Sequence, residues 1–134
     1  MPQLTTEDRL AIGEVIARYC HCVDRGRWDE FIELFSDDCR LDLSQALGLY
    51  EGKAGVGKFV ETMKGLPIVM RHLVTNVVIR GDGEHARSEC YVLAITGSGA
   101  QTNQTAGFYD DEFVKQNGRW LLRARRLMLD GAKG

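Results

Sequence analysis

Asp24 and His72 are the two residues of this sequence whose chemistry best suits a proton-transferring pair. Asp24 lies four residues after Cys20, so on a helix it extends the apolar stripe that ends there. A carboxylate in that position is costly to bury without a partner. A carboxylate that binds an imidazole fixes its tautomer and stabilises its protonated form, which makes the ring a better proton acceptor. The sequence therefore offers His72 as a base with Asp24 as its partner, or as a core histidine hydrogen-bonded to a nearby group, without showing that the two side chains meet.

Two tyrosines and two further histidines also have side chains that could take part in chemistry. Tyr19 and Tyr109 can polarise a carbonyl or hydroxyl oxygen if they face a pocket, although an inward tyrosine more often packs with its hydroxyl satisfied. His21 stands beside cysteines on the first helix, and His85 lies in a turn next to Gly83 and Glu84. We expect both histidines to be structural or solvated.

The arginines near the end of the chain fall on two faces of an expected strand. Strict alternation puts Arg123 and Arg125 on one face, which we interpret as solvated. Arg126 falls on the opposite face with Trp120, Leu122 and Met128, so this arginine is the one expected to point inward.

Three helices are expected to come first and to hold Asp24. The first begins at a cap by Thr5 or Thr6 and ends at Gly26. Its stripe consists of apolar residues at i, i+3 and i+4 spacing: Ile12, Val15, Ile16, Tyr19, Cys20 and Val23. A second helix covers residues 28–35 and is broken by residues 36–38. A strand at 39–43, a short strand or loop up to 52 that contains Tyr50, and a third helix ending at residues 65–67 follow.

Long strands are expected next, and one of them carries His72. They cover residues 69–80, 85–96, 105–116 and 119–129, with a polar loop at 97–103 and a hairpin turn at 117–118. The period of two puts His72, Val74, Asn76 and Val78 on one face of the first long strand. Helices followed by antiparallel strands predict an α+β fold, a curved sheet with helices over one face, in a single domain of residues 1–134.

Composition excludes several classes of function. The 134 residues carry 17 Lys and Arg against 19 Asp and Glu, without the basic face of a nucleic-acid-binding protein. There is no apolar run of membrane-spanning length and no apolar signal peptide, so a cytoplasmic protein is expected. The four cysteines predict buried thiols. Cys20 and Cys22 point about 200° apart on a helix, which argues against a shared metal ion.

Through several motifs, the chain resembles the SnoaL-like group of the nuclear transport factor 2-like superfamily. The resemblance spans nearly the whole chain and rests on Ala17-Arg18-Tyr19-x4-Asp24-Arg25-Gly26-x-Trp28-Asp29, Leu34-Phe35-Ser36-Asp37-Asp38, His72-x3-Asn76, Gly107-x-Tyr109-x-Asp111 and Asn117-Gly118-Arg119-Trp120. It implies a cone-shaped α+β domain with a deep apolar pocket.

Within that superfamily, Tyr19-x4-Asp24 with a strand histidine looks like the branch that contains scytalone dehydratase, lindane dehydrochlorinase and bile-acid 7α-dehydratase. The resemblance implies catalytic roles for His72, Asp24 and Tyr19 in an elimination that needs no cofactor and no metal. Substrate contacts are expected from Tyr109, Tyr50, Asn76 and Arg126. The second histidine of scytalone dehydratase has no counterpart at residues 95–97, so the resemblance does not supply a general acid.

The prediction is therefore a small-molecule lyase or isomerase of dehydratase-like chemistry, acting on an apolar, ring-sized, aromatic or polycyclic substrate. One alternative is a non-catalytic ligand-binding domain or the small subunit of a ring-hydroxylating oxygenase. Another is a polyketide-cyclase-like or ketosteroid-isomerase-like activity in which a carboxylate is the acid or base. An open sheet face that another subunit can cover favours a homo-oligomer, a trimer or a dimer, and neither nucleic acid nor a membrane is expected as a partner.

Overall fold

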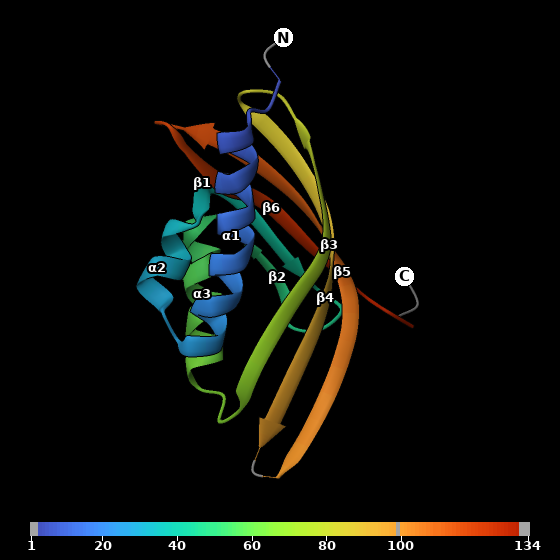
Figure 1. Cartoon of the computed structure of the whole chain (residues 1–134). Helices are drawn as coiled ribbons and strands as arrows, with labels where there is room; N and C mark the ends of the chain where they lie inside the picture. The colour runs from blue at the N-terminus through green and yellow to red at the C-terminus, as the bar shows by residue number, and fades with distance from the viewer. Residues whose placement is uncertain (1–2, 99, 132–134) are drawn as a thin grey trace.

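A computed structural model describes residues 3–98 and 100–131 as three helices that cover one face of a six-stranded sheet (Figure 1). The helices are α1 (Thr6–Arg25), α2 (Trp28–Glu33) and α3 (Gly52–Lys64). The strands are β1 (Phe35–Leu43), β2 (Gly48–Glu51), β3 (Val69–Gly81), β4 (His85–Ser98), β5 (Gln101–Gln116) and β6 (Arg119–Leu129). The predicted α+β fold is confirmed.

The sheet is antiparallel except at one pair of strands. Its order is β2-β1-β6-β5-β4-β3, in which β1 runs parallel to β6 and every other neighbouring pair is antiparallel. β3 is therefore an edge strand. α1 lies over the sheet and contacts β3 and β6, whereas α3 packs against β1 and β2. These contacts bring the end of the first helix beside the first long strand.

Helix α1 begins and ends where the sequence predicts. The Thr5 hydroxyl accepts from the Asp8 backbone N–H while the Asp8 carboxylate accepts from the Thr5 backbone N–H, which is a capping box. Gly26 ends the helix at φ 67°, a left-handed conformation that glycine adopts without strain. The side chain of Asp8 is nearly buried, so its carboxylate needs hydrogen-bond donors around it.

Asp8 also fastens the start of α1 to the β5–β6 hairpin. Its Oδ1 accepts from the indole Nε1 of Trp120 at 3.0 Å and from Nζ of Lys115 at 3.1 Å. The hydrogen bonds from the Thr5 backbone and from Trp120 hold the pKa of Asp8 well below its usual range. The N-terminal end of the helix is thus attached to the far end of the sheet from Asp24.

Two segments extend the strands beyond the predicted bounds. The second helix ends at Glu33, before the predicted break at residues 36–38, and β1 begins at Phe35, which pairs with Leu122 of β6, and not at residue 39. The predicted loop at 97–103 is much shorter, since Gly97 and Ser98 still pair with Thr102 and Gln101. Polar residues indicated a helix break at 36–38 and a loop at 97–103, but pairing with a long neighbouring strand satisfies the backbone and extends the sheet.

A β-bulge in β3 changes which residues share a face. The pairing between β3 and β4 shifts between Thr75 and Val78, and Asn76 takes φ 57° in this irregularity. After the bulge, Ile79 pairs with the buried Ser88, whereas Val78 pairs with the exposed Glu89. His72 and Val74 therefore share the helix-facing side with Ile79, and the predicted place of Val78 on that side is wrong.

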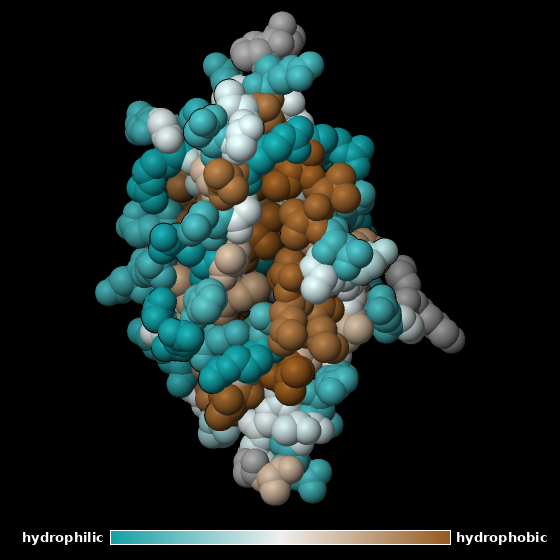
Figure 2. Space-filling view, viewed as in Figure 1, coloured by the Kyte–Doolittle hydropathy of each residue, from teal (hydrophilic) through white to brown (hydrophobic). Residues whose placement is uncertain are grey.

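The edge strand exposes apolar surface. Figure 2 shows a band of hydrophobic side chains beside α1 and over β3. The exposed apolar residues of β3 are Val69, Leu73, Val77 and Val78, and Tyr91 of β4 and Phe108 of β5 are exposed as well. Among the described residues, no helix is both long and apolar enough to cross a membrane.

Candidate active site

The end of α1 and the start of β3 bring Asp24 and His72 together, although 48 residues separate them. Asp24 Oδ1 lies 2.5 Å from Nδ1 of the His72 ring, and Asp24 Oδ2 accepts from the His72 backbone N–H at 2.8 Å. Both carboxylate oxygens of Asp24 therefore bind the same residue, His72. The side chains of Asp24 and His72 are 8% and 11% exposed, so the pair is enclosed but not sealed.

This geometry determines which ring nitrogen can react. With Nδ1 held by Asp24, the other ring nitrogen, Nε2, has no hydrogen-bond partner among residues 3–98 and 100–131. A carboxylate on Nδ1 favours the tautomer that keeps the proton there, which leaves the lone pair of Nε2 free to accept a proton. The second bond, to the His72 backbone, holds the carboxylate itself in place. A ring held in this way can act as a positioned base.

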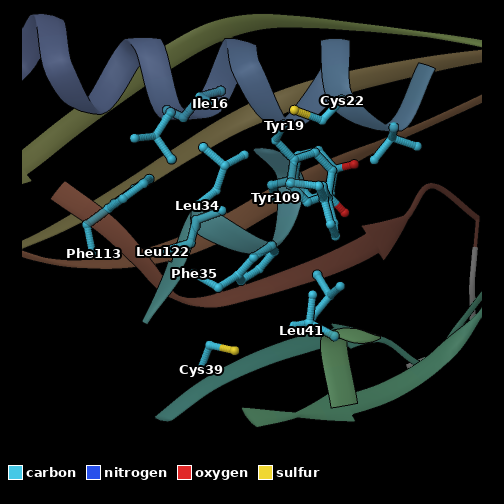
Figure 3. Close-up of a cluster of buried hydrophobic side chains, with 14 of the residues drawn as sticks. Ile16, Tyr19, Cys22, Leu34, Phe35, Cys39, Leu41, Tyr109, Phe113 and Leu122 are labelled. Atoms are coloured by element: carbon cyan, nitrogen blue, oxygen red, sulfur yellow. The ribbon is translucent and has the colours of Figure 1, made fainter. Parts of the chain in front are cut away.

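Tyr19 of α1 and Tyr109 of β5 pack against each other between the helix and the sheet. They do not pack on the Asp24–His72 pair, which we call the dyad. Their ring centroids are 6.0 Å apart, and both residues are almost completely buried. Figure 3 shows the two rings side by side with their hydroxyl oxygens pointing the same way, away from Phe113. Burial raises the pKa of Tyr19 to about 12 and that of Tyr109 well above its usual range.

Both tyrosine rings lie against Arg125, a residue that strict strand alternation does not mark as functional. The guanidinium carbon is 4.3 Å from the centre of the Tyr19 ring and 3.8 Å from that of Tyr109. Asp111 binds the guanidinium with two hydrogen bonds, Nε to Oδ1 at 2.8 Å and Nη2 to Oδ2 at 2.9 Å. Ser88 also donates to Asp111 Oδ2, at 3.2 Å.

The Arg125–Asp111 pair is fully enclosed, with both side chains 0% exposed. Burial works against the charge of Arg125, but Asp111 outweighs it and raises the pKa of the guanidinium well above its usual range. The interpretation of Arg125 as a solvated residue is therefore wrong, and so is the inward orientation expected for Arg126, which is exposed.

A second β-bulge explains this error. Glu112 of β5 pairs with Ala124 and Phe113 pairs with Leu122, so Arg123 is the extra residue on β6. The extra residue reverses the alternation for the rest of the strand, which turns Arg125 toward the helices and Arg126 toward solvent. Arg123 is exposed, as predicted. No turn residue in β6 marks this bulge in the sequence.

The remaining residues expected at a site lie elsewhere. Tyr50 on β2 packs its ring against Phe59 of α3, and its hydroxyl donates to the Leu47 carbonyl. Asn76 is exposed in the β3 bulge. The structure thus unites His72 with Asp24, and Tyr19 with Tyr109, and leaves Tyr50, Asn76 and Arg126 apart from both groups.

The other histidines and the cysteines behave as expected. His21 and His85 are exposed. Cys20, Cys22, Cys39 and Cys90 are buried and free, which confirms the predicted thiols. The Cys22 thiol lies 2.9 Å from Glu30 Oε2, and burial raises its pKa to about 12.

Three hollows on the surface of the described residues are lined by neither Asp24 nor His72. One of about 460 Å³ is lined mainly by charged residues on the outer face of the sheet, including Arg87, Glu112 and Arg126. A second, of about 360 Å³, lies beside it near Asp82 and Arg123. The third, of about 570 Å³, is more apolar and is lined by Leu73, Tyr91 and Phe108 among others. The apolar pocket expected between helices and sheet therefore stays a prediction.

Comparison with known proteins places the chain among similar folds. The family model described as a SnoaL-like domain matches residues 4–126. An uncharacterised protein of Mycobacterium tuberculosis is 28% identical over 122 residues, which are 88% of this chain and 82% of that protein.

Solved structures extend the likeness to the whole fold. A protein of unknown function with a cystatin-like fold from Nostoc punctiforme is 26% identical, with a TM-score of 0.84 over 98% of this chain and 97% of its own. A proposed aromatic ring hydroxylase from Novosphingobium aromaticivorans is also 26% identical, with a TM-score of 0.82 over 96% and 92%. A proposed scytalone dehydratase from the same organism is 24% identical, with a TM-score of 0.80 over 91% and 83%, and shows the fold alone.

Proposed function

The chain belongs to the SnoaL-like domain family, and from its buried dyad we propose that it is a cofactor-independent lyase or isomerase in which His72 removes a proton from carbon. The observation that carries the proposal is the bond of 2.5 Å between Asp24 Oδ1 and His72 Nδ1, together with the bond from the His72 backbone to Asp24 Oδ2. A base held in this way needs no rearrangement before it accepts a proton.

In the proposed step, the C–H bond of the substrate breaks and its proton moves to His72 Nε2. The ring then carries a positive charge, which the Asp24 carboxylate balances. Return of the proton to another carbon would complete an isomerisation. Transfer of the proton to a departing hydroxide would complete a dehydration. Tyr19 is proposed to assist the substrate oxygen with its hydroxyl, since burial raises its pKa and keeps that group protonated.

The proposed substrate is small, apolar and ring-sized. This is supported by the side chains around Tyr19, where Phe31 and Phe35 lie with ring centroids 5.1 and 6.3 Å away. Aromatic walls favour flat apolar ligands, and a few polar groups orient them. Tyr109 is the second proposed substrate contact. Tyr50, Asn76 and Arg126 are not proposed with them, because the Tyr50 hydroxyl donates to the Leu47 carbonyl and Asn76 and Arg126 are exposed.

The test uses deuterium exchange into 2-tetralone, a neutral bicyclic ketone with acidic C–H bonds, followed by proton NMR in D₂O. We expect the wild-type protein to accelerate exchange, and His72→Ala and Asp24→Asn each to lower the rate by about 10²-fold. The matched control is His85→Ala, which removes an exposed histidine and should leave the rate unchanged.

Asp24 is a positioning residue, so its role needs a further readout. Asp24→Glu keeps the carboxylate and should recover part of the rate that Asp24→Asn loses, and the dependence of the rate on pH should change in Asp24→Asn. If the wild type does not promote exchange, or if His72→Ala promotes it as well as the wild type does, the proposal is wrong.

A second candidate is a non-catalytic subunit of a ring-hydroxylating oxygenase. The 26% identity to a proposed aromatic ring hydroxylase is the observation that favours it. A neighbouring gene for a Rieske-type large subunit, and co-purification with that subunit, would favour this candidate over a free-standing enzyme. A carboxylate acting as the base finds less support, because Asp24 and Asp111 are both engaged by basic partners.

We also propose that the protein forms a homo-oligomer through the outer face of its sheet. Exposed Leu73, Tyr91 and Phe108 support this, since they would be covered in such an assembly. Sedimentation velocity would measure the mass, and a monomer at micromolar concentration would contradict the proposal.

A further inference from the structure

The hairpin formed by β4 and β5 extends past the helices at the end of the molecule that holds the dyad. Figure 1 shows both strands running beyond the C-terminal end of α1. β6 stops earlier, because its last residue, Leu129, pairs with Gly107 of β5. Residues 101–106 of β5 lie beyond that point, and all of them are exposed. This part of the sheet is therefore accessible, and it adjoins the strand that carries His72.

Strand register places one side of the hairpin on the same face of the sheet as His72. His72 of β3 pairs with Ala94 of β4, and Ala94 pairs with Thr105 of β5. In the next row toward the hairpin tip, Thr96 pairs with Asn103. Residues that lie opposite each other in neighbouring strands share a face. The pairing of β4 with β5 has no shift, so all of these side chains point to the helix-facing side, where the dyad lies.

Three of these side chains are polar and form what we call the polar wall: Thr96, Asn103 and Thr105. Asn103 and Thr105 are exposed, and Thr96 is half-buried. Thr96 is a diagonal neighbour of His72, at roughly 7–8 Å, and Thr105 is two strands away, at roughly 10 Å. Between His72 and Thr105 stands Ala94, whose methyl group leaves room for a ring beside the imidazole. The polar wall is thus within the reach of one small molecule that also contacts His72.

The polar wall belongs to a long uncharged segment. Residues 90–109 contain no Asp, Glu, Lys or Arg, although 27% of the residues in the whole chain are charged. The other end of the same hairpin carries Arg87 and Glu89 on β4 and Asp110 and Glu112 on β5. An exposed strand end that meets only water usually carries charges, which keep it soluble and prevent pairing with other sheets. A surface of hydroxyls and amides without charge suits the binding of neutral polar groups.

The two faces of the hairpin end also have an unusual polarity. On the outer face of the same strands lie Leu73, Leu93 and Ile95, of which Leu73 is exposed and the other two are half-buried. In an antiparallel sheet with helices on one side, the helix-facing side is normally the apolar one. Here the polar side chains lie on the side that faces the dyad. The helix-facing side of this end is therefore not a packing surface for a helix.

The chemistry of the polar wall defines the part of a ligand that it can bind. Threonine hydroxyls and an asparagine amide both donate and accept neutral hydrogen bonds, which hydroxyl groups of a ligand can match. A carboxylate or an ammonium group would gain no ion pair from these side chains. At roughly 7–10 Å from His72, the bound group is a substituent next to the reacting ring and not the reacting ring itself.

We propose that the polar wall binds a neutral, hydroxylated substituent of the substrate, about the size of one sugar, while the ring attached to it presents its C–H bond to His72. The substrate class is then a ring compound that carries a glycosyl-like group. The position of the ring at His72 rests on the proposed function, whereas the binding of the hydroxylated group does not. The polar wall forms and breaks no covalent bond, and its role is to orient the substrate.

The binding test uses three probes with the same aromatic ring and ether oxygen: 2-naphthyl glucoside, 2-naphthyl glucuronide and 2-methoxynaphthalene. They carry a neutral sugar, an anionic sugar and no sugar, respectively. Fluorescence titration measures the dissociation constant of each. We expect the wild-type protein to bind the glucoside about tenfold more tightly than either of the other two.

Variants of the polar wall locate the sugar. Thr96→Val and Thr105→Val keep the shape of the side chain and remove its hydroxyl, and Asn103→Ala removes the amide. Each should weaken glucoside binding by about three- to tenfold and leave 2-methoxynaphthalene unchanged. The matched control is Thr102→Val, the same change at an exposed position on β5 that faces the outer side and pairs with Gly97. It should bind all three probes as the wild type does.

Thermal melting of each variant checks that the fold is kept. The inference is overturned if the wild type binds 2-methoxynaphthalene as tightly as the glucoside, or if it prefers the glucuronide. It is also overturned if the triple variant Thr96→Val/Asn103→Ala/Thr105→Val keeps the wild-type preference for the glucoside, or if Thr102→Val loses that preference to the same extent as Thr105→Val.

His72→Ala separates this inference from the proposed function. The variant lacks the base but keeps the polar wall, so it should still prefer the glucoside while losing deuterium exchange into 2-tetralone. Preference for the glucoside in a wild type that does not promote exchange would reject the proposed function and support the polar wall as a binding site. Exchange by a wild type that does not prefer the glucoside would support the proposed function and overturn this inference.

Discussion

Two buried pairs each contain an aspartate: Asp111 with Arg125, and Asp24 with His72. They differ in how far they are exposed and in whether the basic partner can accept a proton. Asp111 and Arg125 sit on neighbouring strands β5 and β6, in direct register and completely enclosed, and the guanidinium remains charged. Asp24 and His72 come from a helix and an edge strand, and both remain slightly exposed. The first pair joins two permanent charges inside one sheet. The second joins two separate elements and ends in a nitrogen that can accept a proton.

This difference suggests that the two pairs have different roles. A pair within the sheet is held by backbone hydrogen bonds on both sides, so it can fix donors at one position. A pair between a helix and an edge strand depends on how the two elements pack, and its partial exposure would give a substrate access to the proposed base. Variants that remove one carboxylate at a time should therefore affect stability to different extents.

The largest expected effect follows from Asp111→Ala. This change leaves the Arg125 charge buried without compensation, which should lower the free energy of unfolding by about 3–5 kcal/mol. Urea denaturation followed by circular dichroism measures it. Asp110→Ala, at the adjacent exposed position on β5, is the control and should change little. Replacing both partners, as Asp111→Leu with Arg125→Met, should cost less than Asp111→Ala alone. If Asp111→Ala were as stable as Asp110→Ala, Asp111 would not be compensating a buried charge.

A smaller effect is expected at the dyad. Asp24→Ala removes the acceptor of both the His72 backbone N–H and its ring, which should cost about 1–3 kcal/mol in unfolding free energy. The same urea experiment gives the value, and Asp24→Asn should lose less because the amide oxygen can still accept one bond. A loss from Asp24→Ala that exceeds that from Asp111→Ala would reverse the comparison between the two pairs.

The smallest effect concerns the aspartate at the other end of α1 and depends on pH. Backbone and side-chain hydrogen bonds lower the pKa of Asp8 on folding, so the native state holds fewer protons on this group than the unfolded chain. Its contribution is complete above the ordinary aspartate pKa of about 4 and is lost as the pH falls below that value. The difference in urea midpoint between wild type and Asp8→Asn should therefore shrink between pH 5 and pH 2.

The control for this measurement is Asp37→Asn, which changes an exposed carboxylate on β1. Its midpoint should follow that of the wild type at every pH. A constant difference between wild type and Asp8→Asn from pH 5 to pH 2 would show that the charge of Asp8 is not what stabilises the helix start.

The sequence predicted the helices and the dyad better than it predicted the strands around them. Periodicity and caps located α1 closely, and the family pattern pointed to Asp24 and His72 before their contact was known. The faces of β3 and β6 were partly misjudged for one physical reason. Alternation is a local rule, and a single extra residue at Asn76 or Arg123 reverses it without any sign in the local composition. Arg125 was missed on that account.

The attachments of α1 have a mechanical consequence. Hydrogen bonds of Asp8 attach one end of the helix to Lys115 and Trp120, and hydrogen bonds of Asp24 attach the other end to His72, roughly 24 Å away. Loss of either attachment should let the helix change its orientation relative to the sheet. A substitution of Asp8, far from the dyad, should therefore change the angle at which Asp24 meets His72. The alignment of the proposed base then depends on the whole helix and not on its last turn alone.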